Sequence, residues 1–229
     1  MDDSTRHEDL AAVASMADPQ RRALLEFVSR QHGPVGRDEA AAALGIARGT
    51  AAFHLDRLVA AGLLDTEFQR RTGKSGPGAG RPAKLYRRSA GEMVVSVPER
   101  HYDLAAELLS RAVEESDVTG DPIRPTLERV STEIGRELGA AAGSMDAALH
   151  TLGYEPVDDG LGGVSLSNCP FHRVAQRHTA TICGANAALL QGVAEGVDEQ
   201  ERRVAFEPRE GYCCVRLVAV DASERAGGS

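Results

Sequence analysis

Four cysteines near the C-terminal end are the residues of this sequence whose type and spacing could do chemistry. Cys169, Cys183, Cys213 and Cys214 are separated by 13, 29 and 0 residues, so they form no Cys-x-x-Cys motif. The spacing therefore supports neither a zinc ribbon nor a thioredoxin-like redox site. Three thiolates with a weaker or external fourth ligand would suit an iron–sulfur cluster, whereas three thiolates and a histidine would also suit zinc.

The expected elements around the cysteines favour one set of three ligands. We expect Cys169 and Cys183 to flank a helix, at loop ends where backbone N–H groups can stabilise thiolates. Cys213 lies in an expected strand, where its neighbour Cys214 would point to the opposite face of the sheet. We therefore expect Cys169, Cys183 and Cys213 to bind the metal, with Cys214 and His172 as less favoured candidates. The alternative is a core role, because free cysteine is among the most buried residue types.

The segments that carry the cysteines alternate between short strands and helices, which is typical of an α+β domain. Asp158-Asp159-Gly160 marks a turn between the first two strands. The expected elements are strands at 154–157, 163–167, 204–206 and 212–220, a helical stretch from 172 to about 181, and a helix over 184–194.

The N-terminal part of the chain predicts a helix-turn-helix. Asp18 and Pro19 suit the N-cap and first position of a helix. Two further helices are expected over 38–44 and 48–60, with Gly45 in the left-handed conformation that ends the first of them. A Gly-Leu-Leu sequence then leads from the last helix into a strand. This order of elements is that of a DNA-binding helix-turn-helix followed by a hairpin.

The hairpin tip, within residues 70–87, is rich in glycine and in cations and predicts a wing. Such a loop can lay arginine and lysine along the DNA backbone or into the minor groove. The residues expected to contact DNA are the outward side chains of the 48–60 helix and the cations of the loop: Arg48, Thr50, Phe53, His54, Arg57, Arg70, Arg71, Lys74, Arg81 and Lys84. For His54, a structural role is an equally good interpretation.

Charge is distributed unevenly along the chain. Residues 1–90 carry 14 Lys and Arg against 11 Asp and Glu, a net of +3, whereas residues 91–229 carry 12 against 23, a net of −11. This asymmetry favours a nucleic-acid-binding module joined to an acidic partner domain. The sequence shows neither a signal peptide nor an apolar run long enough to span a membrane, so we expect a cytoplasmic protein without membrane contact.

An apolar stripe over residues 98–115 predicts a long helix between the two halves. The stripe could pack against the chain's own second domain or form the seam of a symmetric dimer, and we favour the dimer because two-fold operators need two-fold proteins. Two further helices are expected at about 124–138 and 144–152. The predicted layout is a winged helix-turn-helix domain over 1–92, a connecting and dimerisation helix over 93–120, and a sensor domain over 121–229.

Two resemblances extend this interpretation. Residues 44–64 and the segment Gly-Arg-Pro-Ala-Lys-Leu-Tyr-Arg (80–87) resemble winged-helix regulators related to ArsR-type repressors, which implies that the 48–60 helix reads the major groove. The C-terminal half is similar to SufR-type iron–sulfur-sensing repressors in Cys-Pro-Phe-His-Arg-Val-Ala (169–175), Cys-Gly-Ala-Asn (183–186) and Gly-Tyr-Cys-Cys (211–214). That resemblance implies a 4Fe–4S cluster, bound at Cys169, Cys183 and Cys213, that controls operator binding.

The sequence thus predicts a homodimeric transcriptional regulator, a repressor by resemblance, that binds double-stranded operator DNA under the control of a 4Fe–4S cluster. A second interpretation keeps the DNA-binding half and makes the C-terminal half a zinc-stabilised or metal-free sensor of a small ligand. An enzyme is not expected: a cysteine could pair with His172 or His178, but nothing marks an orienting acid or an oxyanion site.

Overall fold

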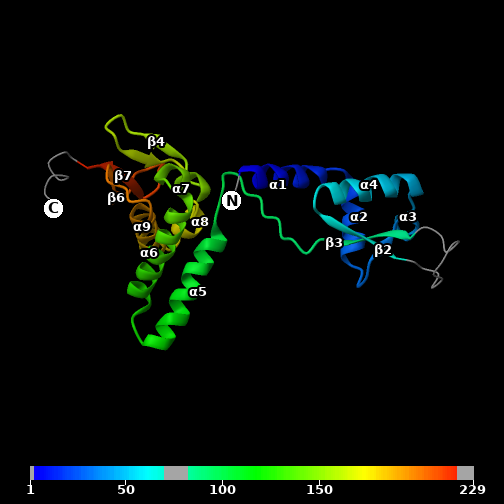
Figure 1. Cartoon of the computed structure of the whole chain (residues 1–229), viewed down its shortest axis with the longest axis horizontal. Coiled ribbons are helices and arrows are strands. Elements are labelled where there is room, and N and C mark those ends of the chain that lie inside the picture. The colour runs from blue at the N-terminus through cyan, green and yellow to red at the C-terminus, as the bar shows by residue number, and fades with distance from the viewer. Residues whose placement is uncertain (1–2, 70–81, 221–229) are drawn as a thin grey trace. The chain divides into compact units, whose positions relative to one another are not determined.

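The computed structural model describes residues 3–69 and 82–220 and divides the chain into two compact units, Met1–Val95 and Ser96–Ser229 (Figure 1). Each unit combines helices with one small antiparallel sheet and has its own buried core. Within the described residues, no helix is both long and apolar enough to cross a bilayer.

In the part of the first unit that the structure describes, four helices pack with a three-stranded sheet. Its elements are α1 (Asp3–Ser15), α2 (Pro19–Ser29), β1 (Val35–Gly36), α3 (Arg37–Leu44), α4 (Arg48–Ala60), β2 (Leu64–Gln69) and β3 (Ala83–Arg88). The strands lie in the order β1-β3-β2, all antiparallel. Leu24 of α2, Leu55 and Leu58 of α4 and Tyr86 of β3 form the centre of the core, so the sheet and the helices share one apolar interior.

Local signals in the sequence correctly placed α2, α3 and α4 of this unit. The Oδ1 atom of Asp18 accepts hydrogen bonds from the backbone N–H groups of Gln20 and Arg21, at 2.9 and 3.1 Å, and so caps α2. Gly45 ends α3 with φ 64°, in the left-handed region that glycine adopts without strain. The helix-turn-helix and the β2–β3 hairpin are thereby confirmed, whereas α1 and the short β1 were not expected.

The second unit is dominated by long helices. Its elements are α5 (Tyr102–Thr119), α6 (Ile123–Ala142), α7 (Met145–Thr151), β4 (Pro156–Asp158), β5 (Val164–Leu166), α8 (His172–Ala175), α9 (Thr179–Gly196), β6 (Arg202–Phe206) and β7 (Val215–Ala219). The sheet has the antiparallel order β4-β5-β7-β6. Helices α6 and α9 lie side by side (Figure 1).

Glycines let α6 and α9 approach backbone to backbone. A Cβ atom at Gly135 would collide with the carbonyl oxygen of Leu189, and one at Gly192 would collide with the carbonyl oxygen of Thr132. Side chains at these positions would force the two helices apart. This close packing fixes α9, the helix that carries Cys183, against the centre of the unit.

The apolar stripe of α5 is covered within its own unit. Ala105, Leu108 and Ala112 are buried in a core cluster that includes Leu127 and Val130 of α6. Of the two alternatives, the stripe thus packs against the chain's own second domain. The expectation that this buried face forms a dimer seam is wrong, because α6 already covers it. The helix also starts at Tyr102 rather than near residue 98, since residues 99–101 make other contacts described below. The dimer itself stays a prediction.

Candidate functional site

The second unit brings all four cysteines together. Cys169 lies just before α8, Cys183 lies inside α9, and Cys213 and Cys214 lie just before β7. The Sγ atoms of Cys183 and Cys214 are 3.4 Å apart. Cys213 and Cys169 form a second pair, joined by a hydrogen bond. Over residues 3–69 and 82–220, no three His, Cys, Asp or Glu side chains are gathered as a site for one metal ion.

Two expectations about these residues need correction. Cys183 is buried in the second turn of α9 rather than at a loop end, because this helix begins at Thr179, five residues before its expected start. Cys213 and Cys214 precede β7, so the alternation of side chains along a strand does not separate them. His172 is exposed on α8.

The surroundings of the thiols differ, and so do their pKa values. The hydrogen bond from Cys213, assisted by the N–H of Phe171 and the charge of Arg100, lowers the pKa of Cys169 to about 7 although burial opposes this shift. Burial and the neighbouring Cys214 raise the pKa of Cys183 to about 12. Near neutral pH, Cys169 therefore supplies a thiolate, the form that binds metals, more readily than Cys183 does.

Buried polar side chains support the Cys213 sulfur. The Nδ2 atom of Asn186 donates to Cys213 Sγ at 3.4 Å, and the hydroxyl of Tyr154 donates to Asn186 Oδ1. Hydrogen bonds of this kind orient a ligand and tune its electronic properties. We did not single out either residue from the sequence, although Asn186 ends the Cys-Gly-Ala-Asn motif that carries the family resemblance.

The cysteine segment also holds the beginning of the second unit. Arg100 Nη1 donates to the carbonyl oxygen of Cys169 at 2.9 Å and also to Asn168 Oδ1. The Nδ2 atom of Asn168, which is buried, donates to the carbonyl oxygen of Glu99 at 3.1 Å. The N–H of His101 donates to the carbonyl oxygen of Pro170 at 3.2 Å. Residues 99–101 are thus fixed by the loop that presents Cys169.

In the first unit, α4 presents an exposed face suited to DNA. Phe53 is 54% exposed, and the guanidinium of Arg57 lies 5.5 Å from the centre of its ring. Thr50 is half-buried on this helix, while Arg48 forms an ion pair with Asp38 in which Nε and Oδ1 are 2.5 Å apart. An arginine can bind a guanine edge and an apolar ring can contact a thymine methyl group, so the chemistry of this face suits contacts with base pairs.

His54 does not belong to this face. It is 7% exposed, and its Nε2 atom lies 4.0 Å from Oδ2 of Asp18, the residue that caps α2. The expectation that His54 points outward is therefore wrong, because position 54 of α4 faces the start of α2. The structural interpretation of this histidine accounts for its burial.

The wing is only partly described. Lys84 lies on β3, where its Nζ atom is 2.7 Å from Oδ1 of Asp56, and the hydroxyl of Tyr86 donates to the same oxygen at 2.8 Å. Partial burial alone would raise the pKa of Asp56, but these two hydrogen bonds lower it below its usual value. Lys84 thus links β3 of the hairpin to α4 through an ion pair with Asp56, which partly neutralises its charge. The other expected wing cations, Arg70, Arg71, Lys74 and Arg81, lie outside the described residues.

Comparison with known proteins identifies the first unit. Residues 16–67 match the family model of a helix-turn-helix domain. The match runs from just before α2 into β2, and such a domain indicates a DNA-binding transcriptional regulator. No curated protein and no solved structure matches the chain.

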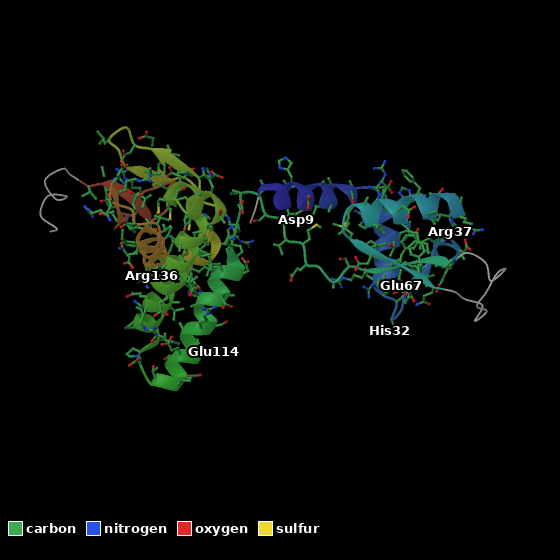
Figure 2. The ribbon with its side chains drawn as sticks, viewed as in Figure 1. Asp9, His32, Arg37, Glu67, Glu114 and Arg136 are labelled. Atoms are coloured by element: carbon green, nitrogen blue, oxygen red, sulfur yellow. The ribbon has the colours of Figure 1, made fainter. Side chains whose placement is uncertain are left out.

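One cation of the helix-turn-helix domain was missed in the sequence. Arg37, labelled in Figure 2, opens α3 and is exposed, and its charge acts on Asp56 of α4. It therefore adds positive potential close to α4, where phosphates would be attracted. Residues 37–88 contain 10 Lys and Arg against 5 Asp and Glu, which was the available signal, but a count does not show which cations lie near α4.

Proposed function

We propose that this protein is a homodimeric transcriptional repressor that binds operator DNA through α4 and the wing, under the control of a 4Fe–4S cluster. Cys169, Cys183 and Cys213 would hold the cluster. The donor set supports this, because thiolates are the usual ligands of such clusters and these three come from separate segments of one unit. The proposal includes no catalytic step.

The observation that carries the proposal is the hydrogen bonding between the cysteine segment and residues 99–101. A bound cluster would link α9, β7 and the loop before α8 through iron–sulfur bonds that oxidation or iron shortage can remove. Through the hydrogen bonds of Arg100 and Asn168, the ordering of this loop would then determine how firmly residues 99–101 are held. In a two-fold dimer, the spacing of the two α4 helices decides whether both half-sites are contacted.

Anaerobic purification followed by iron, sulfide and zinc analysis tests the cluster. We expect brown protein with absorption at ~400 nm and iron and sulfide in equal amounts. Cys169→Ser should lose both, whereas the exposed control His172→Ala should keep both. Colourless wild-type protein that contains zinc, or neither metal, would contradict the proposal.

Zinc is the second candidate, supported by one contact. The 3.4 Å separation of the Cys183 and Cys214 sulfurs is close to the ~3.8 Å expected between sulfurs that surround one tetrahedral zinc at 2.3 Å. A zinc ion would stabilise the second unit without responding to oxidation of the metal. The same metal analysis distinguishes the two candidates.

A further inference from the structure

The proposed cluster uses three cysteines and leaves Cys214 unassigned. Cys214 is half-buried and lies at the end of the loop between β6 and β7, and its sulfur accepts a 3.4 Å hydrogen bond from the thiol of Cys183. Both residues are free thiols in the structure. The unassigned thiol is therefore placed beside one of the three proposed cluster ligands.

We propose that Cys183 and Cys214 form a disulfide when the metal-free protein meets a hydroperoxide, and that this disulfide prevents Cys183 from binding the cluster. The first half of this inference depends only on the thiol geometry, and the second half rests on the proposed function. The disulfide would keep the protein in its metal-free state until a thiol reductant restores both cysteines.

The reaction needs a hydroperoxide and two thiols. The sulfur of Cys214, the more exposed of the pair, attacks the peroxide, and the O–O bond breaks to give a sulfenic acid and an alcohol, or water if the oxidant is hydrogen peroxide. The sulfur of Cys183 then attacks the sulfenic sulfur, and the S–S bond forms as water leaves. Two thiols are oxidised by two electrons and one peroxide is reduced.

The geometry favours this pair over one that contains Cys213. A disulfide has an S–S bond of ~2.05 Å, so the 3.4 Å contact must shorten by only about 1.4 Å. The backbone of each residue makes a 2.8 Å hydrogen bond, from the N–H of Cys213 to the carbonyl oxygen of Leu166 and from the N–H of Glu207 to the carbonyl oxygen of Cys214. The two residues differ in exposure, since Cys213 is 5% exposed whereas Cys214 is half-buried. The sulfur of Cys213 is also held by the amide of Asn186.

Peptide mapping tests the disulfide directly. Trypsin releases Cys183 in residues 178–202, both Cys213 and Cys214 in residues 210–216, and Cys169 in residues 137–173. Metal-free full-length protein treated with hydrogen peroxide, alkylated and digested without reductant should contain 178–202 linked to 210–216. This link should persist in Cys213→Ser and in Cys169→Ser and be lost in Cys214→Ser. A link that persists in Cys214→Ser, or links only between 137–173 and 210–216, would overturn the inference.

Cluster rebuilding tests the consequence. Peroxide-treated wild-type protein should lose its ability to take up iron and sulfide and regain it after dithiothreitol, whereas Cys214→Ser should take up both before and after peroxide. Equal loss in wild type and Cys214→Ser would overturn the protective role of the disulfide. If neither protein takes up iron even before peroxide, the proposed function and the protective role both fail, while the peptide map still decides the disulfide.

Discussion

The guanidinium of Arg100 donates a hydrogen bond to the backbone carbonyl oxygen of Cys169, with Nη1 and O 2.9 Å apart. The same group contacts the side chain of Asn168, whose amide binds the backbone of Glu99. The chain therefore enters its second unit through residues that the cysteine segment holds in place. This relationship connects the thiols to the end of the unit that adjoins the DNA-binding part of the sequence.

The first prediction concerns this connection. Arg100→Met should leave the iron content unchanged but reduce the difference in DNA affinity between cluster-loaded and metal-free protein, because hydrogen bonds from a charged group are worth about 1.5–3 kcal/mol. The measurement is the ratio of the two Kd values for a duplex selected from random sequences. Arg124→Met removes an exposed arginine of α6 and is the matched control. A wild-type ratio in Arg100→Met would show that this contact does not transmit the cluster state.

The second prediction concerns the reading face of α4. Arg57→Ala should weaken binding to the selected duplex by about 1–3 kcal/mol, which is the usual loss for one arginine that reads a base. Arg30→Ala removes an exposed arginine that follows α2 as its C-cap and forms an ion pair with Glu26 four residues earlier, and it should change the affinity little. Titrations by fluorescence anisotropy measure both. Equal effects of the two substitutions would show that Arg57 does not contact the bases.

The third prediction concerns α5 and replaces the dimer-seam interpretation of its stripe. Leu108 is 2% exposed beneath α6, whereas Val113 on the same helix is 43% exposed. Leu108→Ala should lower the free energy of unfolding of the second unit by about 2–5 kcal/mol, while Val113→Ala should change it by less than about 1 kcal/mol. Urea unfolding followed by circular dichroism gives both values. Similar stabilities for the two variants would place Leu108 outside the core.

The fourth prediction follows from the lowered pKa of Cys169. Because a pKa near 7 leaves this thiol half ionised at neutral pH, its alkylation by iodoacetamide in metal-free protein should rise between about pH 6 and pH 8 and then level off. Alkylation of Cys183, whose pKa is raised to about 12, should stay slow across this pH range. Mass spectrometry of residues 137–173 and 178–202 follows the two sites separately. Faster alkylation of Cys183 than of Cys169 at pH 7 would contradict the pKa shifts assigned to the two thiols.

The sequence was most informative where a single residue determines the local backbone. The Asp18 cap, the left-handed Gly45 and the apolar pattern of residues 48–60 placed α2, α3 and α4 without reference to the rest of the fold. His54 was misplaced because the spacing of apolar residues along a helix indicates only the face that packs in the core. This residue is buried by a separate contact with the start of α2.

The cysteine site could be predicted only in part, because its geometry depends on packing between distant segments. The motifs singled out the four cysteines, but the arrangement of their thiols in two pairs depends on where α9 starts and where β7 begins. Spacing along the chain does not contain that information. The contacts of Arg100 and Asn168 span 68 to 69 residues of sequence, and no local pattern predicts them.

We propose that a cluster at Cys169, Cys183 and Cys213 controls DNA binding. The affinity of Cys169→Ser for the selected duplex tests this when it is measured without air, beside iron-loaded and metal-free wild-type protein. The iron content of each sample is determined in parallel. We predict that Cys169→Ser lacks iron and binds at least about tenfold more weakly than iron-loaded wild type, since loss of a single base contact costs about 1–3 kcal/mol. Iron-free Cys169→Ser that binds as tightly as iron-loaded wild type would contradict the claim.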